Sequence, residues 1–197
     1  MTASAPSLRP TLAPVDDETR WQSLRGFSRC LPTGVSVVTV TYSNAAHGAT
    51  VSTASVVSQH PLRFGASLRR GSYLADLVRQ RGEFVLNVLS SRQAAVADWF
   101  ANPERPRGMR QFDYVPWTAH KQSGIPVLGG CLAHFTCRLT DSVSLGATDD
   151  FLVAEVLEGQ GREGRPLVNF AGQLHDVEFR DVFRARREQA GAITTFD

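Results

Sequence analysis

The hydrophobic positions of the chain follow two periods, which separate predicted helices from predicted strands. Between residues 17 and 31 the apolar side chains lie three or four positions apart, which predicts a helix that packs one stripe on the body and stops at Pro32. The stripe consists of Trp21, Leu24, Phe27 and Leu31. This pattern continues for about four turns, so we expect a regular amphipathic helix at the start of the fold.

Two shorter helices are predicted from their capping residues. Ser72 can cap a helix that Gly82 terminates, because serine accepts from free N-terminal amides and glycine tolerates the left-handed backbone at the other end. Ser91 can cap the other, which covers residues 93–101. Both are therefore expected as single-faced helices on the outside of the domain.

The remaining apolar segments are short, rich in β-branched residues, and interrupted by Gly, Asn and Pro, as is typical of strands. Extended segments are predicted at 34–42, 49–57, 63–68, 84–89, 112–117, 131–139, 151–158 and 167–179. Many strands with few helices favour a mainly β fold closed, or nearly closed, into a barrel, because closure removes exposed sheet edges.

Length and composition bound the organisation of the chain. With 197 residues, of which 42% are hydrophobic, we expect one domain over residues 16–179. Residues 1–15 lack periodicity and predict a disordered arm, and residues 180–197 predict a C-terminal helix or tail. No apolar run is long enough for a membrane span or resembles a signal peptide, which predicts a cytoplasmic protein without a membrane partner.

Charge and cysteine content exclude several classes of function. The net charge of +2, from 21 basic and 19 acidic residues, gives no reason to expect a nucleic-acid partner. Cys30, Cys131 and Cys137 form no CxxC pair and have no histidines at zinc-ligand spacing. We therefore expect buried free thiols, with neither a disulfide framework nor a metal site.

Two polar segments are candidates for ligand binding. The segment 47–55 places hydroxyl side chains on a strand beside a glycine, which suits a phosphate or ribityl chain; the alternative is a solvated sheet face. Arg69, Arg70 and Ser72 lie between a predicted strand and a predicted helix, where guanidinium charge and free amides suit an anion. The alternative there is an ordinary helix cap with two solvated arginines.

Asn87 is the only polar residue in the apolar segment 84–89. A buried amide costs a few kcal/mol unless it is hydrogen-bonded, so it must have a partner. Either a backbone loop or the edge of a heterocycle such as a flavin could supply that partner.

Four motifs together resemble the flavin reductase family. They are Leu31–Val40, His47–Thr53, His60–Leu62 and Phe84–Leu89, in the order and spacing of that family. The resemblance covers about residues 20–178 and implies a homodimeric FMN-binding split barrel with Greek-key-like connections, with flavin along the Thr/Ser strand near the dimer interface. It assigns flavin contacts to Thr33, Thr50, Val51, Ser52, Thr53, Arg69, Ser72 and Asn87.

The activity that the resemblance implies is hydride transfer from NADH or NADPH to FMN or FAD, with the reduced flavin released to a partner monooxygenase. The chain departs from the family pattern where Asp149 and Phe170 stand in place of histidines of the nicotinamide side. The candidate catalytic residues are therefore Asp149 and His175, which follows shortly after Phe170 in the sequence. This departure leaves two alternatives open: an enzyme that retains its flavin and acts directly on an organic substrate, or a non-catalytic flavin-binding partner protein.

Overall fold

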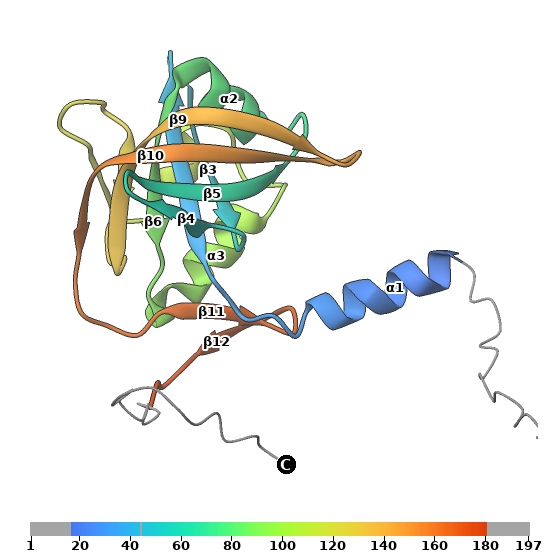
Figure 1. Cartoon of the computed structure of the whole chain (residues 1–197). Coiled ribbons are helices and arrows are strands. Elements are labelled where there is room, and N and C mark those ends of the chain that lie inside the picture. The colour runs from blue at the N-terminus through green and yellow to red at the C-terminus, as the bar shows by residue number, and fades with distance from the viewer. Residues whose placement is uncertain (1–16, 44, 181–197) are drawn as a thin grey trace, which may run out of the picture.

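A computed structural model describes residues 17–43 and 45–180 of the chain. The N-terminal arm and the C-terminal helix or tail expected from the sequence lie outside these residues. Figure 1 shows a body of antiparallel strands with one helix that projects from it.

The body is built on a seven-stranded antiparallel sheet. Its strands are β2 (Ser36–Tyr42), β3 (Ala45–Val51), β4 (Ser55–Gln59), β5 (Leu62–Arg69), β6 (Glu83–Val88), β9 (Ala133–Leu145) and β10 (Asp149–Gly161). They are hydrogen-bonded in the order β3-β2-β6-β9-β10-β5-β4. The sheet therefore starts and ends with strands that are neighbours along the chain, β3 and β4.

Two small sheets complete the strands. One contains β1 (Thr33–Gly34), β11 (Leu167–Phe170) and β12 (Gln173–Asp176), and the other contains β7 (Trp117–Ala119) and β8 (Pro126–Leu128). In the first, Thr33 is paired with Asn169, so the start of the domain is held against its end.

The helical elements are α1 (Asp17–Ser28), α2 (Tyr73–Arg81) and α3 (Ala94–Ala101), with 3₁₀ turns η1 (Ser91–Gln93) and η2 (Gly108–Phe112). The caps predicted for α2 are confirmed, because Ser72 accepts from the Ala75 amide and Gly82 has a φ of 75°. The helix predicted at 93–101 is confirmed as α3, but its cap is wrong by one residue. Ser90, not Ser91, precedes the 3₁₀ turn that leads into α3, and the amide of Ser90 donates to Gln93 Oε1.

Two apolar clusters fill the body. One lies between α2 and the concave part of the main sheet, around Val78 and Leu86. The other joins α3 and η2 to β2 and β3, around Phe100 and Phe112. Cys131 and Cys137 are buried, as expected, but Cys30 is exposed just beyond α1.

Three sequence-based expectations about the fold are corrected. The main sheet is not closed into a barrel within the described residues, since no hydrogen-bonded ladder joins the edge strands β3 and β4. The single strand predicted at 49–57 is two strands, because Ser52–Ala54 leave the ladder between them. The segment 112–117 is not a strand: it leaves the 3₁₀ turn at Phe112, continues as a turn and a bend, and reaches β7 only at Trp117.

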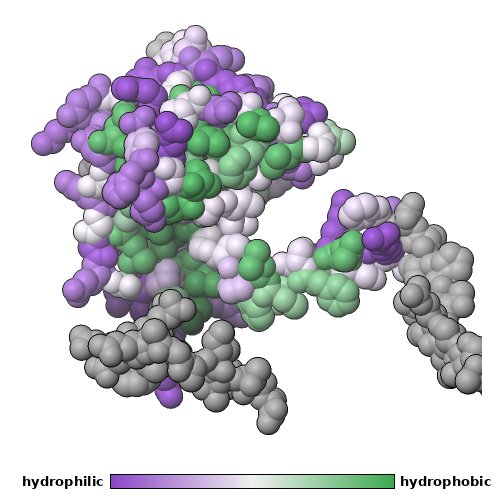
Figure 2. All heavy atoms as spheres, viewed as in Figure 1, coloured by the Kyte–Doolittle hydropathy of each residue, from purple (hydrophilic) through white to green (hydrophobic). Residues whose placement is uncertain are grey.

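The helix predicted at 17–31 forms, but it does not pack on the body. Residues 18–31 are all exposed, with Trp21 at 59% and Phe27 at 71% of their full accessibility. Figure 1 shows α1 pointing away from the sheets, and Figure 2 shows apolar side chains along it. Its amphipathic pattern is therefore present without an intramolecular surface to cover.

Within the described ranges, none of the helices has the length and apolar character required to cross a bilayer.

Candidate functional site

A cavity of about 350 Å³ opens between the end of β3, the end of β5 and the start of α2. Six of the residues assigned to flavin by resemblance line it: Thr50, Val51, Ser52, Thr53, Arg69 and Ser72. The structure thus brings both polar segments singled out in the sequence, 47–55 and 69–72, to one place. We call this cavity the hydroxyl pocket.

The hydroxyl segment is held from both sides. Thr50 donates its hydroxyl proton to the carbonyl of Ala97 in α3 at 2.6 Å. The hydroxyl of Thr53 forms two hydrogen bonds with the backbone of Ser67, each with a length of 3.0 Å. Its Oγ1 accepts from the Ser67 amide and donates to the Ser67 carbonyl. These bonds fix the turn that follows β3, so the pocket wall is preorganised.

The turn between β5 and α2 forms the opposite wall. Gly71 has a φ of 69°, a left-handed conformation that reverses the chain there. Ser72 caps α2, because its Oγ accepts from the Ala75 amide at 3.3 Å. The interpretation of this serine as an ordinary helix cap is therefore confirmed. Arg69 is exposed and forms no ion pair in the described part of the chain, which leaves its charge available to a ligand.

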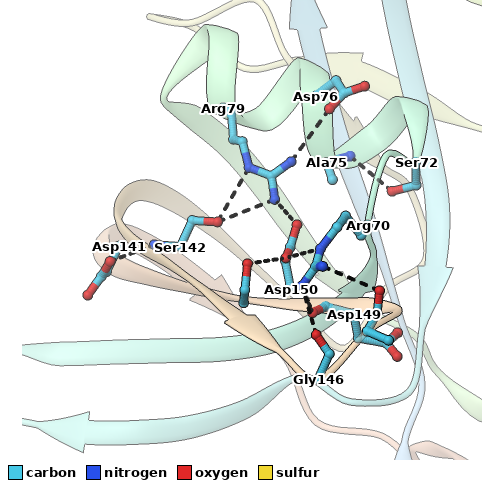
Figure 3. Close-up of polar contacts among 12 residues, drawn as sticks. Arg70, Ser72, Ala75, Asp76, Arg79, Asp141, Ser142, Gly146, Asp149 and Asp150 are labelled. Carbon is cyan, nitrogen blue, oxygen red and sulfur yellow. Dashed lines mark hydrogen bonds and ion pairs between the residues drawn. The ribbon is translucent and has the colours of Figure 1, made fainter.

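The second arginine of the motif has a structural partner. Figure 3 shows the side chains of Arg70 and Arg79 directed at Asp150, which is almost completely buried. Arg70 Nε donates to Asp150 Oδ1 at 3.0 Å, and Arg79 Nη2 donates to Oδ2. The bond from Arg70 is the main cause that lowers the pKa of Asp150, against the opposing effect of burial. This cluster ties the β9–β10 hairpin to α2 beside the pocket.

Four residues near the pocket were not identified from the sequence: His47, Tyr73, Arg105 and Arg107. His47, Tyr73 and Arg105 line the cavity, and the guanidinium of Arg107 lies 5.5 Å from the centre of the Tyr73 ring. His47 packs edge-on against Tyr73 with ring centres 5.1 Å apart. Burial, with the charges of the two arginines, lowers the pKa of His47 to about 4, so its imidazole is neutral at pH 7.

The segment that carries Arg105 and Arg107 is fastened to β3 by Gln111. This side chain is completely buried; its Oε1 accepts from the Gly48 amide at 2.9 Å and its Nε2 donates to the carbonyls of Ala46 and Gly108. In the sequence the same segment has two prolines and no periodicity. Its two arginines are the only signal there for an anion-binding role.

Three assigned residues lie elsewhere. Asn87 is fully buried inside the sheet, where its amide donates to the Val37 carbonyl and accepts from the Leu128 amide. It does not line the hydroxyl pocket, and backbone groups of the strands β2 and β8, not a loop, are its partners. Thr33 and His175 line a separate, more apolar groove of about 710 Å³ formed by β1, β11 and the segment after β12.

The two candidate catalytic residues are not brought together within one chain. Asp149 begins β10, where it is the backbone partner of Arg69, and its carboxylate accepts from Thr148 at 2.6 Å. His175 lies on β12 of the small sheet, with Nε2 3.2 Å from the Phe170 carbonyl.

Residues 28–178 match the family model for the flavin reductase like domain. The chain belongs to this family. The match includes every residue that lines the hydroxyl pocket and all of the groove residues except Phe179. Membership of this family makes the chain an oxidoreductase.

Relatives of known name agree with the family. The chain is 65% identical over 192 residues, 98% of its length and 99% of the relative's, to an "NADPH-flavin oxidoreductase" of Streptomyces viridifaciens. It is 31% identical over 162 residues to the reductase component of a 4-nitrophenol monooxygenase of Rhodococcus opacus, covering 82% and 84% of the two chains.

Solved structures resemble the same fold. BorF, the flavin reductase component of a bacterial two-component tryptophan halogenase, superposes with a TM-score of 0.75 at 30% identity, over 81% of this chain and 99% of its own. The NADH:FAD oxidoreductase SgcE6 of Streptomyces globisporus gives 0.73 at 28% identity, over 86% and 99%. The expected family resemblance is confirmed.

Proposed function

We propose that this protein is an NAD(P)H-dependent flavin reductase that supplies reduced FMN or FAD to a separate monooxygenase. The observation that carries the proposal is the hydroxyl pocket, whose lining combines five Ser or Thr residues with guanidinium groups and contains no carboxylate. Such a lining suits the hydroxyl-rich chain and the phosphate of a flavin nucleotide. The names of the relatives supply the reaction.

We assign the flavin phosphate to Arg69 and the N-terminus of α2, and the ribityl chain and ring to Thr50, Val51, Ser52 and Thr53. Arg69 has an unpaired charge, and the first amides of α2 point toward the cap at Ser72. Flavin accepts a hydride when bound; the protein contributes binding, orientation and the exclusion of water. Asn87 is left out of this assignment because its amide is already bonded inside the sheet.

We propose that Asp149 and His175 form the nicotinamide side of the site. Asp149 lies beside Arg69, so a bound nicotinamide could approach from the β9–β10 hairpin. His175 borders the apolar groove together with Thr33, whose buried hydroxyl has no partner in the described structure. Because the two belong to different sheets of one chain, we propose that a second copy contributes one of them to a common site.

We also propose that the chain is a homodimer in which α1 docks on a second copy. A helix of 12 residues is marginal in water on its own, and α1 exposes its whole apolar stripe. Light scattering after gel filtration should give twice the chain mass, and the double variant Trp21→Ser/Phe27→Ser should shift it toward the single chain. A wild-type monomer at micromolar concentration would contradict this assignment.

NADPH is the electron donor that we propose, because the relative with 65% identity carries that specificity in its name. The test mixes protein, FMN or FAD, and NADPH or NADH without oxygen and follows the bleaching of the flavin absorbance. Rapid bleaching above the buffer control supports the reductase; none with either donor rejects it.

The two alternatives from the sequence give different results in the same experiment. A flavoenzyme that keeps its cofactor should stay yellow through gel filtration and respond to an organic substrate. A flavin carrier should bind flavin and reduce nothing. We place the protein in the cytoplasm, where nicotinamide cofactors are available, and cell fractionation tests this.

A further inference from the structure

Arg105 is a partly buried cation without an anionic partner. It lies in the segment between α3 and η2, where Nη1 donates to the Asn102 carbonyl at 2.6 Å. Its Nη2 contacts the Gly48 carbonyl and lies 3.1 Å from His47 Nε2, while Nε is buried without a partner. Over the described ranges, Arg105 forms no ion pair with any carboxylate.

This arrangement is unfavourable for a residue with a purely structural role. Removing a guanidinium from water is costly unless a counter-ion offsets its charge, and all of its contacts here are neutral acceptors. His47 cannot serve as a counter-ion, because a neutral imidazole carries no negative charge. The positive charge of Arg105 is therefore left for something that the chain itself does not provide.

The position of Arg105 indicates what that is. It lines the hydroxyl pocket together with Arg69, and Arg107 lies against Tyr73 on the same wall. The charge of Arg70, by contrast, is neutralised by its ion pair with Asp150 (Figure 3). The pocket thus has two walls that each contribute an unpaired guanidinium, although a single phosphate bound at the start of α2 would need only Arg69.

We propose that Arg105, oriented by His47, binds a second phosphate group of the ligands of this pocket. The inference rests on the proposed flavin reductase function and names a residue for which neither the four family motifs nor the anion motif at 69–72 gives a role. The phosphate belongs either to FAD, as the second of its two phosphates, or to the 2′ position of NADPH, since a guanidinium fork recognises either in the same way. His47 is a positioning residue, because it acts only through Arg105.

The test compares ligands with and without the second phosphate. FAD is compared with FMN, and NADPH with NADH, by equilibrium titration calorimetry on Arg105→Gln and Arg105→Met. The methionine variant keeps an apolar side chain of similar reach, so it provides a folded protein if glutamine does not. Arg110→Gln is the matched control, because it removes the same charge from an exposed arginine of the adjoining η2 that forms no ion pair within the described residues.

Loss of a charge-assisted contact should weaken binding roughly tenfold or more. A loss confined to FAD, with FMN unchanged, assigns the second flavin phosphate; a loss confined to NADPH, with NADH unchanged, assigns the 2′-phosphate. Equal changes within both pairs, or no change, would overturn the proposal. Wild-type protein that binds flavin without reducing it would reject the reductase function, while these equilibrium comparisons would still decide the role of Arg105.

Discussion

Arg70 and Asp150 join the β5–α2 turn to the β9–β10 hairpin through a hydrogen bond of 3.0 Å between Nε and Oδ1. The two residues are 80 positions apart, and the carboxylate is almost fully buried. Arg69, the proposed phosphate contact, is the immediate neighbour of Arg70. The bond therefore fixes one wall of the hydroxyl pocket.

Replacing Asp150 with asparagine should destabilise this wall, because two arginines would lose their buried counter-charge. We expect the melting temperature of Asp150→Asn to fall by several degrees at pH 7. Since the pKa of Asp150 is lowered below its usual 3.8 in the folded protein, its contribution is present above that value and disappears as pH falls further. The difference in melting temperature between the two proteins should thus be largest at pH 7 and become smaller as the pH falls below 3.8.

Asn87 should matter for stability and not for flavin binding. Asn87→Ala removes the acceptor of the Leu128 amide and leaves a cavity inside the sheet, which should cost roughly 2 to 4 kcal/mol of unfolding free energy. Urea unfolding measures this loss, and FMN titration of the folded variant should give an unchanged affinity. A selective loss of FMN binding at normal stability would restore Asn87 to the flavin site.

Gly48 lies in a position where only glycine fits. A Cβ there would be 2.6 Å from Cε1 of Phe100, a ring buried between α3 and the sheet. Gly48→Ala should therefore lower the unfolding free energy by about 1 to 3 kcal/mol. Gly26→Ala is the control, since nothing lies within 4 Å of its added methyl on exposed α1; there we expect no loss. Equal stability of the two variants would contradict the close packing at Gly48.

His47 should make the protein sensitive to mild acid. Its pKa falls from 6.5 to about 4 on folding, so the unfolded chain binds a proton more readily between these values. Stability should be unaffected by this residue above about pH 6.5 and decrease as pH falls toward 4, by on the order of 2 kcal/mol. His47→Gln should flatten this part of the curve in urea unfolding between pH 7 and 4. An identical slope in the variant would show that other groups cause it.

The sequence by itself determined the local features of this protein. Ser72 and Gly82 bound α2 because capping depends on residues within one turn of the helix. The hydroxyl strand and the arginine turn were recognisable as polar segments for the same reason, and the order of four motifs was sufficient to identify the family. The split of segment 49–57 was missed, since alternation alone does not show where a strand leaves its ladder.

Only the tertiary structure decided which of these features cooperate. Arg105 and His47 are 58 positions apart and meet because Gln111 fastens an irregular segment to β3, an interaction without a local pattern. Asn87 was correctly expected to need a partner, but the partner, Leu128, is 41 positions away. The open sheet and the uncovered stripe of α1 likewise depend on which surfaces meet in space. The spacing of apolar residues shows that one face of a helix is apolar. Only the packing in the folded structure decides which surface covers that face.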